Sequence, residues 1–139
     1  MHPILRNILA LVAGIILGSI VNMGLINVSG YIIPPPEGID NTTMEGLQQA
    51  MSRFEPKHFL FPFLAHALGT LTGAWLVARL AVSYKFAFAM AIGLLFLAGG
   101  IYMVMLLPSP VWFNTLDLGA AYLPMALLGW WLAVRKSHQ

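Results

Sequence analysis

ILALVAGIILGSIVNMGLI, residues 8–26, is an uninterrupted apolar run without a charged residue. A helix needs roughly 20 apolar residues to cross the hydrocarbon core of a bilayer, because each residue adds about 1.5 Å. The run is too long for the apolar part of a signal peptide, and no A-x-A cleavage site follows it. We therefore expect a retained transmembrane helix over about residues 4–26.

Three further segments have the same character, at about residues 58–82, 86–107 and 112–134. Only a few residues link one of these segments to the next, which favours antiparallel neighbours. The chain is 59% hydrophobic and only 9% charged, whereas soluble domains carry about 25% charged residues. The predicted fold class is therefore an all-α integral membrane protein, a single domain (1–139) built as an antiparallel bundle of four transmembrane helices.

The first connection, about residues 27–57, is long. Its proline run, residues 34–36, favours an extended segment. Thr42-Thr43-Met44-Glu45 is typical of a capping box, so a short helix is expected over about residues 43–53. This helix would lie on the membrane surface or over the mouth of the bundle.

The basic residues predict the orientation of the bundle. One side would hold Arg6, Arg79, Lys85, Arg135 and Lys136. The other would hold Arg53 and Lys57 among acidic neighbours. Because cytoplasmic loops are enriched in Lys and Arg, both termini are predicted to be cytoplasmic and the first loop extracytoplasmic, in the inner (plasma) membrane.

Small residues at helical spacing predict where the helices touch. They are Gly14 and Gly18 on the first helix, Gly69 and Gly73 on the second, and Ala91, Ala98 and Gly99 on the third. Lipid provides no hydrophobic drive for helices to associate, so close backbone approach at such residues is expected to hold the bundle together.

Each predicted span carries few polar residues, and these share a depth in the extracytoplasmic half. They are Asn22, His66, Tyr102 and Asp117, with Asn114 nearby. Each of the first four follows or precedes small residues by three or four positions, so each should lie on the packing face of its helix. Polar groups at membrane depth are costly and face the bundle interior, which predicts a polar cluster in the core.

His66 and Asp117 are the central pair of this predicted cluster. An imidazole and a carboxylate can share a proton near neutral pH. The pair is expected either to join two helices by a hydrogen bond or to form a working site for a proton, a cation or a polar headgroup.

Glu55 and His58 are predicted to lie at the mouth of the bundle. His58 and His66 stand about 12 Å apart along a helix, so one metal ion cannot bind both together with Asp117. No metal site and no cofactor are predicted. Pro124 lies inside the fourth span, where it would act as a hinge or a static kink.

Two resemblances bear on function. Ala65-His66-Ala67-Leu68-Gly69-Thr70-Leu71-Thr72-Gly73 resembles the histidine helix of rhomboid proteases, which would make His66 a general base. The G-x-S-G serine of that family is missing, so the likeness covers one helix. The stretch from Phe54 to Thr70 resembles small uncharacterised bacterial inner-membrane proteins, over most of the length. That likeness implies a bacterial source and no particular mechanism.

The sequence thus favours a non-enzymatic membrane protein, an accessory subunit or scaffold of a membrane complex. The alternatives are a small oligomeric transporter or channel using His66 and Asp117, and an outer-leaflet lipid-modifying enzyme. With no cysteine and a net charge of +2, thiol chemistry and nucleic-acid binding are excluded. The predicted partners are the lipid bilayer and either further copies of the chain or another membrane subunit.

Overall fold

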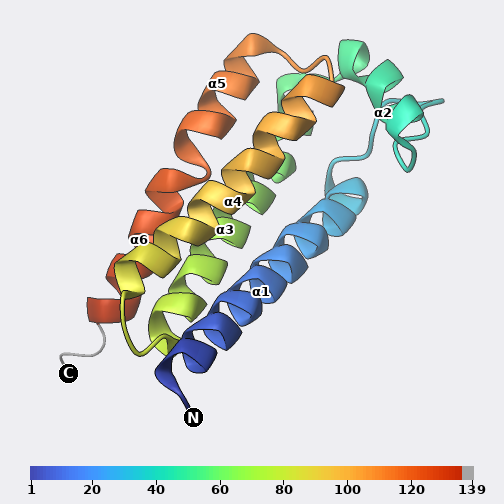
Figure 1. Ribbon diagram of the computed structural model, residues 1–139. Helices are drawn as coiled ribbons and strands as arrows, with labels where there is room; N and C mark the ends of the chain where they lie inside the picture. The colour runs from blue at the N-terminus through green and yellow to red at the C-terminus, as the bar shows by residue number, and fades with distance from the viewer. Residues whose placement is uncertain (136–139) are drawn as a thin grey trace.

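The computed structural model describes residues 1–135, which form helices and their connections without a strand. The helices are α1 (Pro3–Ile32), α2 (Met44–Ala50), α3 (Leu60–Leu80), α4 (Lys85–Leu106), α5 (Val111–Ala120) and α6 (Leu123–Arg135) (Figure 1). In this part of the chain four segments are long and apolar enough to cross a membrane: Pro3–Ile32, Pro56–Leu80, Lys85–Leu106 and Val111–Arg135. The all-helical prediction is confirmed, and these segments indicate a membrane protein. Lys136, used above for orientation, lies outside the described residues.

α1 continues beyond its predicted end at residue 26, through to Ile32. Its start is capped by His2, whose side chain accepts a hydrogen bond from the Ile4 amide at 3.3 Å. Nothing in residues 27–32 forces a break, and the helix stops only before Pro34. Proline disfavours helical backbone in the residue before it, which accounts for the non-helical backbone of Ile33, at φ −126° and ψ 85°.

α3 is the central helix, because α1, α4 and α6 all pack against it. Its glycines meet those of α1 in register. A Cβ atom added to Gly14 would lie 2.7 Å from the carbonyl oxygen of Gly73, and one added to Gly18 would lie 2.7 Å from that of Gly69. The two backbones therefore touch where only glycine fits.

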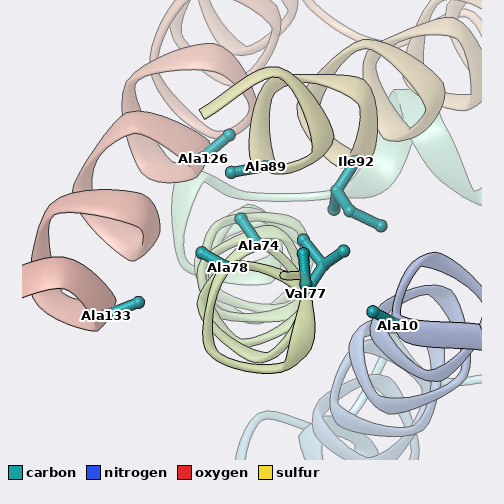
Figure 2. Close-up of a cluster of buried hydrophobic side chains, with 9 residues drawn as sticks. Ala10, Ala74, Val77, Ala78, Ala89, Ile92, Ala126 and Ala133 are labelled. Atoms are coloured by element: carbon teal, nitrogen blue, oxygen red, sulfur yellow. The ribbon is translucent and has the colours of Figure 1, made fainter. Parts of the chain in front are cut away.

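The core around α3 consists mainly of alanine. Figure 2 shows Ala74, Val77 and Ala78 of α3 among buried side chains from the neighbouring helices. These neighbours are Ala10, Ala89, Ile92, Ala126 and Ala133. Short side chains let the helices approach closely, so van der Waals contact rather than large side chains holds them.

The packing face of α4 differs from the prediction. Ala98 and Gly99 are exposed, and a Cβ on Gly99 would meet nothing within 4 Å. The buried face instead carries Gly93 and Gly100, and a Cβ on Gly100 would lie 2.5 Å from the Tyr122 hydroxyl oxygen. The helix is therefore rotated relative to the expected orientation.

The fourth span was expected as one helix over residues 112–134, but it is broken into α5 and α6. The break falls at Ala121 and Tyr122, just before Pro124 in the first turn of α6. Proline has no amide hydrogen, and its ring clashes with the carbonyl of the residue four positions earlier, here Ala120. The helix therefore stops and restarts rather than bending gently.

The short loop helix, α2, begins one residue later than its predicted start and ends at Ala50, followed by a turn of 3-10 helix. Its N-cap is Thr43, whose hydroxyl accepts a hydrogen bond from the Gly46 amide at 3.0 Å. The predicted capping box starting at Thr42 is wrong: Thr42 donates from its amide and its hydroxyl to the Asp40 carboxylate. These bonds hold the pKa of Asp40 below its usual value.

Hydrogen bonds at the opposite end of the molecule fasten α1 to the turn between α3 and α4. The buried side chain of Asn7 donates to the Ser83 hydroxyl at 2.8 Å and accepts from the Val82 amide at 2.9 Å. Tyr84 follows in the left-handed region, at φ 50°. Sequence reasoning did not single out Asn7, which sits only one turn inside the helix.

Candidate functional site

The His66 and Asp117 side chains meet between α3 and α5. The Nδ1 atom of His66 lies 2.8 Å and 3.0 Å from the two carboxylate oxygens of Asp117. The Asp117 side chain is 4% exposed and that of His66 is 27% exposed. A buried carboxylate requires hydrogen-bond donors, and the imidazole provides one from a neighbouring helix.

Tyr122 is the third member of this group. Its hydroxyl donates to Oδ2 of Asp117 at a long 3.4 Å, and its ring stacks on that of His66 with centroids 5.6 Å apart. A continuous helix would turn Tyr122 about 140° away from Asp117. The break before Pro124 positions the Tyr122 side chain next to Asp117. Helical periodicity assumes an unbroken helix, so it did not predict this contact.

A cavity of about 330 Å³ lies between α1, α3 and α4, with His66 and Tyr122 in its wall. The wall also contains Ser19 and Asn22 from α1, and the other lining residues are apolar or glycine. Gly99 lines the cavity on α4, which agrees with the open space beside its Cα. The cavity thus combines a few polar atoms with apolar walls, as ligand sites do.

Asn22 lines this cavity and also carries an unsatisfied acceptor, which is buried away from the open space. Its Oδ1 atom is buried and has no hydrogen-bond partner among the described residues. The side chain lies over Gly69, and its Cβ would be 3.2 Å from a Cβ added there. A buried polar atom without a partner is uncommon in folded proteins, and the hydroxyl of Thr70, one turn from His66, is a second case.

Two predicted members of the polar cluster lie elsewhere. Tyr102 is 61% exposed and is not in the cavity wall, because it lies four residues after Ala98, on an exposed side of α4. Asn114 lies on α5 but bonds Ser109: it accepts from the hydroxyl at 2.6 Å and donates to the carbonyl at 3.3 Å. Asn114 therefore fastens the turn between α4 and α5.

The mouth residues form a separate hydrogen-bonded group. The Nδ1 atom of His58 accepts from the Glu55 amide at 2.9 Å, so Nε2 carries the hydrogen and donates to the Pro34 carbonyl at 3.2 Å. The Glu55 carboxylate pairs with Lys57 at 3.2 Å and is largely exposed. His58 thus ties the proline run to the start of the α3 segment.

The cluster offers hydrogen bonding and proton exchange. Within residues 1–135 no three His, Asp or Glu side chains are grouped to hold a metal ion. When Nδ1 of His66 donates to the carboxylate, the lone pair of Nε2 is left to accept a hydrogen bond or a proton. No hydrogen bond joins Ser19 to His66 among the described contacts, although both line the cavity.

The fold and the cavity define a helical protein with four segments able to span a membrane and a polar cluster between them. No protein-family model matches this chain, and neither does any curated protein or solved structure. The resemblances to bacterial inner-membrane proteins and to the rhomboid histidine helix therefore stay predictions.

Proposed function

We propose that this protein is a multi-pass membrane protein that binds a small molecule, drawn from the bilayer, in the cavity between α1, α3 and α4. The observation that carries the proposal is a cavity whose mostly apolar wall includes a few polar side chains. His66 is held by Asp117, and the side chains of Asn22 and Ser19 belong to the same wall. A purely structural pair does not require the adjoining space.

The lateral position of the opening supports entry from lipid. Exposed lining residues include Met23 on α1 and Leu95 in the middle of α4, and the lining continues to Met103 in the last turn of α4. α1 packs on α3 and makes little contact with α4, so the two helices leave a slot over α3. If α1 and α4 cross the bilayer, this slot faces hydrocarbon.

Four antiparallel spans with both termini in the cytoplasm are part of the proposal. The glycine register supports opposite directions for α1 and α3, since Gly14 meets Gly73 while Gly18 meets Gly69. In Figure 1 the start of α1 and the end of α6 lie at the same end of the molecule. The basic residues of that end favour the cytoplasm.

The test uses Gly99, which lines the cavity and where an added Cβ meets nothing within 4 Å, so that Gly99→Leu would place a side chain at the cavity without a clash. Gly24→Leu is the matched control, because a side chain there also meets nothing but is not in the cavity wall. Wild type and both variants are purified in mild detergent, incubated with the total lipid of the source membrane and weighed by native mass spectrometry. We expect a lipid adduct on wild type and Gly24→Leu, and its loss in Gly99→Leu. The proposal is wrong if the adduct is equal in all three, or absent from wild type.

A transporter is the second candidate, favoured by the buried His66–Asp117 pair. Below the pair, the described core offers Thr70 and then Ala74, Val77 and Ile92, with no further buried polar side chain before Asn7. A transported proton or cation would need a rearrangement to pass this apolar stretch. Flux in proteoliposomes that Asp117→Asn abolishes, with folding intact, would favour this candidate.

An accessory or scaffold role, the first prediction from sequence, is distinguished by the same variants. In that case Asp117→Asn and His66→Ala would lower stability or assembly with a partner, and filling the cavity at Gly99 would change nothing. Altered lipid products in cells lacking the protein would instead favour the lipid-modifying alternative.

A further inference from the structure

The end of the molecule that holds the start of α1 and the end of α6 carries positive charge without a counter-charge (Figure 1). Its described basic residues come from four different helices and are Arg6, Arg79, Lys85 and Arg135. The chain has five acidic residues, of which Asp117 belongs to the buried cluster and the other four lie between α1 and α3, at the opposite end. Neither ion pair within residues 1–135 involves these four cations. This end of the molecule therefore attracts anions.

Two of the guanidinium groups lie at the end of α6. Nη1 of Arg79 donates to the carbonyl oxygen of Ala133 at 3.3 Å, which fastens α3 to the last turn of α6. Arg135 is exposed, and its guanidinium lies over the ring of Trp131, 5.0 Å from the centroid. Such stacking uses the flat face of a guanidinium and leaves the N–H groups at its edge to bind the oxygens of a phosphate.

An apolar groove on α6 leads to this charge. It is lined by Pro124, Leu127, Leu128, Trp130 and Trp131. Positions 124, 127, 128, 131 and 135 follow one another at helical spacing, so Arg135 continues the face on which the groove lies. Leu127, Leu128 and Trp131 are each more than a third exposed, so the groove is open to whatever surrounds the helix.

The length of this face matches one leaflet of a bilayer. Pro124 and Arg135 are separated by about 16 Å along α6, at about 1.5 Å per residue, and half of a hydrocarbon core is about 15 Å thick. At the charged end, Phe86 of α4 packs edge-on against Trp130 with centroids 5.1 Å apart, which brings the neighbouring Lys85 beside the last turns of α6. The groove therefore runs from the depth of the bilayer centre to a cluster of cations at head-group level.

We propose that this groove on α6 is a binding site for an anionic phospholipid of the leaflet at the basic end. The phosphate binds Arg135, and an acyl chain follows the groove toward Pro124. Arg79 and Lys85 add an attraction that a zwitterionic head group, which has no net charge, does not gain. The groove shares no lining residue with the cavity that contains His66, so this site is independent of the proposed function.

Dioleoylphosphatidylglycerol and dioleoylphosphatidylcholine test this proposal, because they have the same chains and differ in net charge. Their dissociation constants are measured by native mass spectrometry on the full chain carrying Gly99→Leu, so that lipid in the other cavity does not contribute. We expect the phosphatidylglycerol to bind about tenfold more tightly or better, and Arg135→Gln to weaken its binding about fivefold, the contribution of one basic residue at an anionic surface. Arg53→Gln is the matched control, because it removes the same charge from an exposed position at the opposite end and should leave both constants unchanged.

Equal binding of the two lipids would overturn the proposal, and so would equal losses in Arg135→Gln and Arg53→Gln. Glycerophosphoglycerol, the same head group without chains, is added in large excess as a competitor. If it displaces the lipid, the basic end is a site for soluble anions and the groove plays no part. A lipid-free dimer that Trp131→Ala dissociates would assign the groove to a second copy of the chain and also overturn the proposal.

The outcome for this groove can be separated from the outcome for the cavity. Wild type is expected to carry a lipid at each site, and Gly99→Leu only the one on α6. Loss of the groove lipid in Arg135→Gln leaves the proposed function untouched, because that function is decided by the adduct that Gly99→Leu removes and Gly24→Leu retains.

Discussion

At the scale of single residues, the His66–Asp117 contact is a buried polar link between α3 and α5. Interhelical hydrogen bonds in membranes are worth less than their burial suggests, because the unfolded chain in the bilayer also finds partners. We therefore expect the pair to fix how α3 and α5 pack against each other, while adding only modestly to the free energy of unfolding.

The size of this coupling can be measured with a double-mutant cycle. His66→Leu, Asp117→Leu and the double variant are compared by reversible unfolding in detergent micelles. We expect a coupling energy of about 1 kcal/mol, in the range found for buried polar contacts in membrane proteins. Strictly additive single effects would mean that the contact contributes nothing to folding.

Tyr84 is held in the left-handed region at φ 50° at the start of α4, with its ring largely exposed. This conformation costs an L-residue roughly 1 kcal/mol, and glycine adopts it freely. Tyr84→Gly should raise the unfolding free energy by about this amount. Tyr84→Ala removes the same ring but keeps the strain, so it should show no such gain, and a gain of equal size would show that the ring rather than the backbone matters.

At the scale of elements, the α1–α3 contact depends on backbone approach at paired glycines. A Cβ on Gly14 would reach the carbonyl oxygen of Gly73, which is backbone and cannot rotate away. Gly14→Ala should therefore lower the unfolding free energy by about 1–3 kcal/mol, the usual cost of overpacking.

Gly24→Ala is the control for this prediction, because it changes the same residue type in the same helix where the added Cβ meets nothing. It should be neutral or slightly stabilising through helix propensity. If the two variants unfold alike, the glycine register does not hold α1 against α3.

The helix break between α5 and α6 falls at Ala121 and Tyr122, and we attribute it to Pro124, which follows in the first turn of α6. Pro124→Ala restores an amide and removes the clash, so the span should straighten. The chain has no cysteine, so spin labels can be attached only at two introduced sites, Val111→Cys at the start of α5 and Leu128→Cys within α6. Pulsed electron paramagnetic resonance then measures the distance between the two labels. We expect a longer distance in Pro124→Ala and no change in Pro108→Ala; an unchanged distance in both would assign the break to the packing of Tyr122.

At the scale of the whole molecule, the proposed topology places the first loop and the turn between α3 and α4 on opposite sides of the membrane. Asn41→Cys and Tyr84→Cys each introduce the only thiol, since the chain has none of its own. In intact spheroplasts a membrane-impermeant maleimide should label Asn41→Cys, whereas Tyr84→Cys should react only after lysis. The reverse pattern would invert the proposed orientation, and equal labelling would contradict four complete spans.

The prediction that copies of the chain or a partner subunit assemble with it can be tested by native mass spectrometry of the complex extracted in mild detergent.

The sequence by itself determined the features that depend on composition along one helix. Length and hydropathy were enough to locate four apolar segments, and the spacing of Gly14, Gly18, Gly69 and Gly73 indicated the faces that meet. The depth of His66 and Asp117 followed from the rise per residue, and their small-residue spacing indicated that they face each other. The end of α1 was misjudged because polar residues near a helix end do not stop a helix, whereas proline does.

Only the tertiary structure decided the rotation of α4 and the place of Tyr122. α4 is apolar on every side, so hydropathy carries no signal for which face is buried, and Tyr102 was assigned to the core although it lies outside. Tyr122 reaches Asp117 because the helix breaks before Pro124, which changes the periodicity on which a sequence argument depends. The cavity likewise exists because α1 and α4 separate over α3. A space between helices is a property of their mutual packing, and local sequence does not encode it.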